Sequence, residues 1–434
     1  MENMSKSWLS LGSVIMAGSL ILCGADWVAA DETQVNTYTT NNQRDPSVAM
    51  DADGDFVVTW ESYGQDSGTI PGYGVYAQRF DSSGNPAGLE FPVFASSYDQ
   101  RNPAAAMDGD GNFAIAFEHD TNGLGNVGIW GWRYNSNGSF AGNMIIASEY
   151  PAKQYPSIAM ADGSGNFTVT WDGLDDDSYG IYGRRYEGDG DLYVDTFRVN
   201  TTETSIQTKS SVGMDNYSNL LVAWESHGGQ DGDGIGVFAQ MYAYSDTKSG
   251  VEFQVNTTTE GNQTNPSAAM SWGGRGVVVW ESSASDGNLD TYDIYGQAIK
   301  LDGSLVGEEF IINATTEGYQ GRPSVAMDAI GNFVVAWASE GQDGSSQGVY
   351  ARKFDWSGNP LSGEFLVNTT TSGSQTLPAV AADLNTGSFV TAWQGPDEDG
   401  DGVFMSWPLE VPEPAILSDG FESGDTSAWS GTVP

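Results

Sequence analysis

The chain has 434 residues, of which 39% are hydrophobic and 12% aromatic, so it can build a packed core and wholesale disorder is excluded. It carries 58 Asp and Glu against 16 Lys and Arg, a formal net charge of -42. Such a surface repels phosphate backbones and anionic lipid head groups, which excludes nucleic acid and membrane surfaces as expected partners.

The first thirty residues have the pattern of an export signal. The apolar run from Leu9 to Leu22 is shorter than the about 20 residues that a spanning helix needs, and it leads to a small-residue cleavage pattern at Val28-Ala29-Ala30. We expect cleavage near Ala30 and a secreted, extracellular or cell-surface protein with no transmembrane segment in the mature chain. Cys23, the single cysteine, would be lost with the signal, so the mature fold has to hold without disulfides.

Seven copies of one unit fill the rest of the chain. Each copy has an apolar aromatic residue at the same place, at Trp60, Phe117, Trp171, Trp224, Trp280, Trp337 and Trp393. A Gln lies ahead of each aromatic, at Gln43, Gln100, Gln154, Gln207, Gln263, Gln320 and Gln375, and in six copies a Pro follows it. The apolar segments are short, rich in Val, Phe, Tyr and Trp, and bounded by Gly, Asp, Asn or Pro, which is typical of β-strands joined by tight turns.

Four short strands in a unit of roughly 55 residues suit one blade of a β-propeller. The last unit has no fourth strand of its own, but the matching phrase Val35-Asn36-Thr37 stands at the mature N-terminus. We therefore predict an all-β, seven-bladed β-propeller of four-stranded blades, closed by an N-terminal strand that completes the last blade. The predicted domains are a signal peptide over 1–30, the propeller over 31–410 with blades starting near 44, 101, 155, 208, 264, 321 and 376, and a flexible C-terminal tail over 411–434.

The units resemble propeller families whose blade opens with a Pro, a small-apolar inner strand and an Asp-Gly turn, such as NHL and YVTN repeats. They are more similar to uncharacterised tandem repeats of exported bacterial proteins that carry phrases of the type GNFVVAWES and VNTTT. The resemblance covers residues 34 to about 410 and implies a fold and an exported lifestyle. It implies no particular activity, because propellers of this kind serve many functions.

Acidic residues are concentrated in the loops between the second and third strands. An acid follows the repeated aromatic in five units, at Glu61, Glu118, Asp172, Glu225 and Glu281. Oxygen ligands on Gly-rich loops suit Ca²⁺, so the candidate metal ligands are Asp175, Asp176, Asp177, Asp231, Asp233, Asp399 and Asp401. The alternative is a solvated acidic rim that favours solubility. No cofactor is required by the sequence, and Ca²⁺ is the one cation that these loops would suit.

Candidate ligand-binding residues are acids and aromatics of the same loops. They are Glu61, Asp66, Glu118, His119, Trp130, Trp132, Asp172, Glu225, Asp231, Glu281 and Asp343. Irregularly placed aromatics, including Tyr63, Tyr73 and Tyr292, are further candidates for stacking on sugar rings. The repeated Gln residues are expected to fix neighbouring blades together, with a polar ring around a ligand as the alternative.

The sequence favours a non-catalytic binding or adhesion module over an enzyme. Only His119 and His227 exist, which disfavours a His-based triad or a multi-His metal site. Similar acids spread around the ring are what a binding scaffold would show, whereas an enzyme should concentrate distinctive residues in one or two blades at the channel mouth. The expected ligand is a polysaccharide or a surface protein, met by the acidic face of a monomer with or without calcium. The alternative is a carboxylate-dependent glycan hydrolase or lyase.

Overall fold

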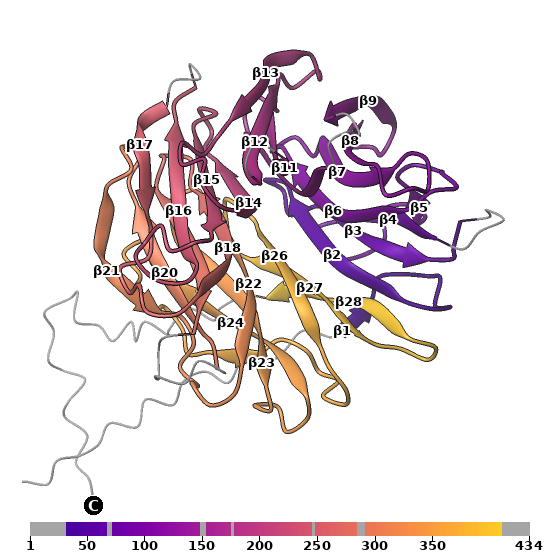
Figure 1. Ribbon diagram of the computed structural model, residues 1–434. Coiled ribbons are helices and arrows are strands. Elements are labelled where there is room, and N and C mark those ends of the chain that lie inside the picture. Colours follow the sequence, from indigo (N-terminus) through magenta and orange to yellow (C-terminus); the bar gives the residue numbers. More distant parts are fainter. Residues whose placement is uncertain are drawn as a thin grey trace, which may run out of the picture. The chain divides into compact units, whose positions relative to one another are not determined.

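The computed structural model describes residues 32–66, 72–147, 153–174, 178–244, 248–283 and 291–409, which form part of one compact unit. Their strands make seven four-stranded antiparallel sheets around a common centre, with the chain running from the innermost strand of each sheet outward (Figure 1). The predicted seven-bladed propeller is confirmed. No helix among the described residues has the length and apolar character needed to cross a membrane.

The first six blades each use four consecutive strands. Blade 1 contains β2 (Gln43–Met50), β3 (Phe56–Tyr63), β4 (Tyr73–Phe80) and β5 (Phe91–Pro92), and blade 2 contains β6 (Gln100–Met107), β7 (Phe113–Asp120), β8 (Val127–Tyr134) and β9 (Phe140–Ala147). Blade 3 contains β10 (Lys153–Met160), β11 (Phe167–Leu174), β12 (Tyr179–Tyr186) and β13 (Leu192–Arg198), and blade 4 contains β14 (Gln207–Met214), β15 (Leu220–Ser226), β16 (Gly236–Tyr242) and β17 (Lys248–Gln254). Blade 5 contains β18 (Gln263–Met270), β19 (Gly276–Ser282), β20 (Asp293–Ile299) and β21 (Leu305–Ile311), and blade 6 contains β22 (Gln320–Met327), β23 (Phe333–Glu340), β24 (Gln347–Phe354) and β25 (Phe365–Leu366).

Blade 7 joins the two ends of the propeller. It contains β26 (Thr376–Ala382), β27 (Phe389–Pro396) and β28 (Asp401–Leu409), and its outermost strand is β1 (Glu32–Gln34) from the start of the described chain. In Figure 1 the indigo β1 lies beside the yellow β28. Glu32 pairs with Ser406 and Gln34 with Phe404, and Val35 then donates to the carbonyl of Val403 at 2.8 Å. The ring is closed by the N-terminal strand, as the repeat count predicts.

The hydrophobic core lies between the blades. The seven repeated aromatics on the second strands are at most 1% exposed, because each second strand is covered by the neighbouring blade on both sides. Each core cluster draws its buried side chains from two adjacent blades; one, for example, joins Trp60 and Val58 of blade 1 with Val390 and Val403 of blade 7. Burial on both faces explains why these strands are continuously apolar instead of alternating.

Many acids serve the fold. In the turn after the first strand of four blades, one carboxylate oxygen accepts backbone N–H groups two and four residues on, as Asp51 does from Asp53 and Asp55, both at 2.9 Å. Asp108, Asp215 and Asp328 repeat this arrangement. The Asp-Gly turns are therefore explained by hairpin chemistry.

In five blades, a second set of acids ties the outer strand, or the segment leading to it, to the loop that precedes the blade. Glu32 accepts from the backbone N–H groups of Thr369 and Thr370, both at 2.9 Å, and from the Thr369 hydroxyl at 3.2 Å. Four further acids on outer-strand segments take up the same role, namely Glu90, Glu252, Glu309 and Glu364. In blade 7 this bond also anchors the strand that closes the ring.

Replacing Glu32 with Ala is expected to lower the free energy of unfolding by about 1–2 kcal/mol, because the three donors that Glu32 satisfies lose their partner. Urea denaturation measures this loss. The matched control is Glu203→Ala, which removes an exposed ion pair to Arg198 and should change stability by about 0–1 kcal/mol. Equal losses in the two variants would contradict a role for Glu32 in closing the ring.

Candidate functional site

The innermost strand of every blade bulges at the same place. Its ladder with the second strand shifts register there, between Arg44 and Ser47 in blade 1 and at the matching positions of the other six. The residue within each bulge has a positive φ of 48° to 58°, and we call these seven the bulge residues: Asp45, Asn102, Tyr155, Lys209, Asn265, Arg322 and Leu377. A Pro follows in six blades, and Pro within a sheet belongs at bulges because it cannot donate to the ladder.

The bulge residues surround a depression at the centre of the ring. Together with the residues that follow them, Pro46, Pro103, Pro156, Ser210, Pro266, Pro323 and Pro378, they line a volume of about 320 Å³, which we call the central depression. Positive φ is uncommon for Tyr, Leu, Lys and Arg, and such strain clusters at functional sites when the surroundings enforce it. Here the strained positions all face one cavity.

The acids on the second strands stabilise the strained backbone. In five successive interfaces, a carboxylate accepts the N–H of the next blade's bulge residue. Glu61 accepts from Asn102 at 2.7 Å, Glu118 from Tyr155 at 2.7 Å and Asp172 from Lys209 at 2.9 Å. Glu225 accepts from Asn265 at 2.6 Å and Glu281 from Arg322 at 2.7 Å. Blades 6 and 7 have Ala338 and Gln394 at this position.

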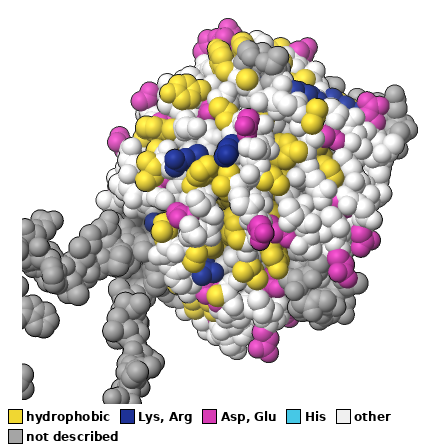
Figure 2. Space-filling model, turned by 90° about the vertical axis from the view of Figure 1, so that its left-hand side faces the viewer, with side chains coloured by type: hydrophobic (Ala, Val, Ile, Leu, Met, Phe, Trp, Pro, Cys, Tyr) yellow, Lys and Arg dark blue, Asp and Glu magenta, His cyan; other side chains and the backbone are white. Residues whose placement is uncertain are grey.

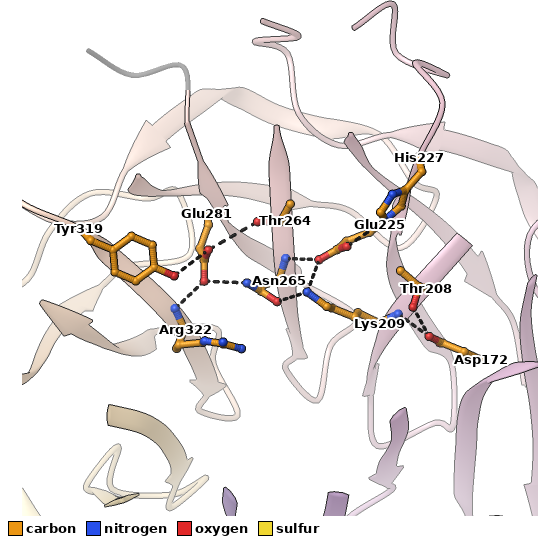
Figure 3. Close-up of polar contacts among 10 residues, drawn as sticks. All are labelled: Asp172, Thr208, Lys209, Glu225, His227, Thr264, Asn265, Glu281, Tyr319 and Arg322. Atoms are coloured by element: carbon orange, nitrogen blue, oxygen red, sulfur yellow. Dashed lines mark hydrogen bonds and ion pairs between the residues drawn. The ribbon is translucent and has the colours of Figure 1, made fainter. Parts of the chain in front are cut away.

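Polar side chains extend these bonds into a network across blades 3 to 6 (Figure 3). Lys209 Nζ lies 3.1 Å from Glu225 Oε1 and donates to Asn265 Oδ1 at 2.7 Å. His227 Nε2 lies 3.3 Å from the other oxygen of Glu225. Figure 3 shows Asn265 between the carboxylates of Glu225 and Glu281, so that the side chains beneath the depression hold one another in place.

Burial and charge shift the pKa values of these carboxylates in opposite directions. Burial raises the pKa of Asp172 to about 7, against the lowering effect of hydrogen bonds from Thr208 and from the N–H of Lys209. Burial also acts to raise the pKa of Glu225, but His227 and Lys209 more than offset it, and the pKa of Glu225 falls below its usual value. Glu225 is thus charged at neutral pH, whereas Asp172 titrates there.

Among the bulge residues, Asp45 and Tyr155 are the groups that can exchange protons. Burial raises the pKa of the Asp45 carboxyl, partly countered by the charges of Arg44, Arg322 and Arg101. Burial and then the charges of nearby carboxylates, first Glu118, raise the pKa of the Tyr155 phenol, whose side chain stays accessible. The depression therefore presents a carboxylate of raised basicity and a phenol that keeps its proton at neutral pH.

Arg322 brings a positive charge to the same cavity. Its side chain is exposed, and within the part of the chain that the structure describes its guanidinium makes no hydrogen bond or ion pair. Its charge acts on Asp45, two blades away around the ring. An exposed guanidinium at a strained position can bind a carboxylate or sulfate of a ligand.

The five acids that follow the repeated aromatics lie on the second strands, behind the central depression. Glu61, Glu118, Asp172, Glu225 and Glu281 are between 0% and 8% exposed and are occupied by the bonds to the bulge residues. Their repetition around the ring follows from blade packing, and it does not by itself mark a ligand face.

Blade 2 gathers the predicted aromatic candidates into a packed cluster. His119 is 5% exposed, lies 3.0 Å from the Ser96 hydroxyl through Nε2, and contacts the ring of Trp130. Trp130 and Trp132 stack at 5.9 Å, and Phe94 packs against both. These rings fill the interface with blade 1 and extend its core.

Most of the predicted loop acids accept hydrogen bonds from nearby side chains or backbone N–H groups. Asp66 accepts from the Tyr76 hydroxyl at 2.6 Å, and Asp231 accepts from Asn256 at 3.1 Å. Asp343 accepts from the N–H of Ser345 at 2.9 Å, Asp233 from that of Gly261 at 3.2 Å, and Asp401 from Gln394 at 2.9 Å, while Asp399 is exposed. On the side of the molecule drawn in Figure 2, acidic side chains lie scattered among apolar and a few basic ones.

No group of three or more acidic, His or Cys side chains among the described residues is arranged to hold a metal ion. Asp175, Asp176 and Asp177 lie outside the described residues. The calcium prediction therefore stays a prediction.

The bulge residues were missed by the reasoning from sequence. The repeated Pro and Gln drew attention, and the variable residue between them did not. A signal was present, since seven nearly identical units place Asp, Asn, Tyr, Lys, Asn, Arg and Leu immediately before the Pro or its Ser210 counterpart. Variation at one position of a strong repeat marks a site where the blades differ in task.

No protein-family model and no curated protein sequence matches the chain. Solved structures do match it in fold. A protein of unknown function from Dyadobacter fermentans has a TM-score of 0.52 at 10% identity, over 89% of this chain and 99% of that one. An ulvan lyase of a new polysaccharide lyase family, bound to an oligosaccharide of glucuronic acid and sulfated rhamnose, has a TM-score of 0.56 at 12% identity, over 86% and 95%. The α-L-arabinanase of Penicillium chrysogenum, complexed with arabinobiose, has a TM-score of 0.50 at 12% identity, over 72% and 94%.

These findings contradict the expectation of a non-catalytic binding module, and with it the expectation that the chain is not an enzyme. The two similar structures named above with assigned activities, the ulvan lyase and the arabinanase, are carbohydrate-processing enzymes. The prediction of a binding module depends on similar acids spread around the ring. In the structure these acids accept hydrogen bonds from backbone N–H groups of the next blade. At the central depression, in contrast, the blades present residues of several types.

Proposed function

We propose that the protein is a glycan-processing enzyme that cleaves a uronate-containing polysaccharide by β-elimination at the central depression. The observation that carries this proposal is the set of seven bulge residues, of six residue types, all strained and all lining one cavity. The likeness in fold to an ulvan lyase supports the proposal without assigning a substrate.

An acidic polysaccharide fits the charge of the cavity. The chain as a whole has a net charge of -42, yet two of the seven bulge residues, Lys209 and Arg322, are basic. Arg322 is the exposed group that would bind the sugar carboxylate, and Lys209, which is paired with Glu225, lines the same depression. Neutralising the carboxylate makes the neighbouring C5 proton of a uronate easier to remove.

Asp45 and Tyr155 take the roles of base and acid. The Asp45 carboxylate removes the C5 proton, the electron pair forms the C4=C5 double bond, and the C4–O bond to the next sugar breaks. The Tyr155 hydroxyl gives its proton to the leaving oxygen, and both groups return to their starting states by exchange with water. The products are an unsaturated uronate end and a free hydroxyl end, and no water is consumed.

Elimination fits the cavity better than hydrolysis. Glycoside hydrolases use two carboxyl groups that flank the bond, about 5–9.5 Å apart. Asp45 is the one carboxylate among the residues that line the central depression, and the neighbouring second-strand acids are buried and bonded to backbone. A single carboxylate facing a phenol and a guanidinium suits proton abstraction next to a neutralised carboxylate.

The test is to incubate the purified protein with polymers of glucuronate, galacturonate and mannuronate, and with neutral arabinan as the control. We expect ultraviolet absorbance from unsaturated uronate ends with at least one uronate polymer and no new ends from arabinan. Cleavage of arabinan alone, release of saturated ends alone, or no cleavage of any polymer would overturn the proposal.

We further propose that this activity lies outside the cytoplasm, in a monomer whose repeats are related to those of exported bacterial propellers. The predicted signal at 1–30 and the similarity of the units to such repeats support this location. The expected tail at 411–434 lies outside the described residues. Ca²⁺ binding by the acidic loops is likewise a proposal.

A further inference from the structure

Two guanidinium groups lie over one tyrosine ring at the edge of the central depression. The Cζ atom of Arg44 is 4.3 Å from the centre of the Tyr73 ring, and that of Arg101 is 4.1 Å from it. Arg44 and Arg101 come from the innermost strands of blades 1 and 2, and Tyr73 begins the third strand of blade 1. Two guanidinium groups that share one ring repel each other, so the arrangement needs compensating contacts.

Three carboxylates supply that compensation, and one of them is Asp45, whose Oδ2 lies 3.3 Å from Arg44 Nε. Glu61, 1% exposed, accepts from Arg44 Nε at 3.0 Å. Asp99 accepts from Arg101 Nη2 at 2.8 Å through one oxygen and from the N–H of Tyr73 at 3.0 Å through the other. The same acids therefore place both arginines and the ring, and the cluster is built in advance of any ligand.

Donor groups remain for a ligand on both arginines. The hydrogen bond that Arg44 makes to the described residues goes through Nε, and those of Arg101 go through Nε and Nη2 to Asp99. The side chains are 31% and 36% exposed. Guanidinium groups bind planar or tetrahedral oxyanions with paired N–H donors, and stacking on an aromatic ring holds them in orientation.

The cluster adjoins the proposed catalytic groups. Arg44 and Arg101 each directly precede a bulge residue, Asp45 and Asn102, and both charges act on the Asp45 carboxyl. A polymer whose cleaved sugar lies in the central depression would extend its next sugars outward past a blade edge. The edge between blades 1 and 2 is where the pair of arginines stands.

We infer that Arg44, Tyr73 and Arg101 form a subsite for the oxyanion substituent, a sulfate ester or a carboxylate, on a sugar next to the cleaved one. This inference rests on the proposed function, because it assumes a polysaccharide in the central depression. It makes the enzyme selective for polymers with a charge on that sugar.

The inference is tested by binding, measured by affinity electrophoresis in gels that contain an intact polymer. The Tyr155→Phe background keeps the polymer whole. A sulfated glucuronate polymer, its desulfated form and a polymer of uronate alone separate the two sources of the oxyanion. We expect Arg101→Gln to weaken binding of at least one charged polymer about tenfold, a loss of one charge-assisted contact.

Arg101 is the better position to change, because its partner Asp99 is 38% exposed, whereas Arg44 pairs with buried Glu61. Arg79→Gln, at the other end of β4, is the matched control for loss of one positive charge. A sulfate-dependent loss identifies a sulfate subsite, and a loss with the uronate polymer identifies a carboxylate subsite.

Unchanged binding of every charged polymer by Arg101→Gln, or an equal loss in Arg79→Gln, would overturn the inference. Its failure can be told from failure of the proposed function. If the parent cleaves the polymer but Arg101→Gln has no effect on binding, the subsite alone is refuted. If binding depends on Arg101 but the parent cleaves no polymer, the elimination reaction alone is refuted.

Discussion

Replacing Tyr155 with Phe is expected to lower kcat on a uronate polysaccharide by about 10²–10⁴-fold, the usual contribution of a positioned proton donor. KM should stay near its original value, because Phe keeps the ring at its strained position in blade 3. The reason is specific to the hydroxyl: it is the group in the central depression that can protonate the leaving oxygen at neutral pH. Steady-state kinetics of the unsaturated product measures the change.

The pH dependence of kcat/KM should reflect the ionisation of both Asp45 and Tyr155. Asp45 must be ionised to act as a base, and burial raises its pKa, so the acid limb of kcat/KM should lie above the range of an ordinary Asp. Tyr155 must keep its proton, and its raised pKa should move the alkaline limb upward as well. Asp45→Asn should remove activity at every pH, since an amide cannot accept the C5 proton.

Matched controls lie in the turns at the opposite end of the innermost strands. Tyr217→Phe removes a hydroxyl from a side chain that is 71% exposed, and Asp53→Asn removes an exposed charge. Both should leave kcat unchanged. Full kcat in Tyr155→Phe, or an equal fall in Tyr217→Phe, would show that Tyr155 has no part in proton transfer.

The second prediction with a large effect concerns the free energy of unfolding. Removing the charge of Asp172 and removing that of Glu225 should change it in opposite directions. Asp172 has a pKa of about 7 in the folded protein against about 3.9 in an unfolded chain, so the folded state binds the extra proton between these values. Its contribution to stability is therefore present at low pH and is lost as the pH rises towards 7. Asp172→Asn should remove this loss and stabilise the protein at pH above about 7, by an amount on the order of a few kcal/mol.

Glu225 should behave in the reverse way. Its folded pKa is lowered, so its charged form stabilises the fold at all pH values above its unfolded pKa, and this contribution is lost only as the pH falls through the folded pKa. Glu225→Gln should therefore destabilise the protein at neutral pH by about 1–3 kcal/mol, because Lys209 and His227, which stay accessible to water, lose a charged hydrogen-bond partner.

Denaturant unfolding of both variants and the parent, in mildly acidic and in mildly alkaline buffer, compares the two signs. The stabilising effect of Asp172→Asn should appear in the alkaline buffer and shrink in the acidic one. A destabilisation by Asp172→Asn as large as that of Glu225→Gln in the alkaline buffer would mean that Asp172 is charged and fully paired, contrary to the burial argument.

The fold could be predicted because its determinants repeat. The same architecture is indicated by the seven aromatics at matching positions, by the short apolar segments and by the displaced Val35-Asn36-Thr37 phrase. The structure closes the ring with Glu32 to Gln34, directly ahead of that phrase. Repetition makes a core position visible in one sequence, since packing between blades demands the same residue type seven times.

The repeated acids, however, are not the residues that line the proposed site. Glu61 and its four counterparts recur because each binds a strained N–H of the next blade, a need that is not visible before the bulge is known. The site residues differ from blade to blade, so a search for shared residues passes over them. Tyr73 was a candidate for stacking on sugars, but its position between two arginines depends on contacts between blades that spacing along the chain cannot reveal.

The central claim is that the central depression binds the sugar to be cleaved. The most direct measurement is a crystal structure of the Tyr155→Phe variant with a uronate oligosaccharide. We predict a sugar carboxylate within hydrogen-bond distance of the Arg322 guanidinium, with C5 facing Asp45 and the glycosidic oxygen facing residue 155. An oligosaccharide bound elsewhere, for example in the cavity that Trp171, Tyr182 and Leu174 line in blade 3, with the central depression holding only solvent, would contradict the account.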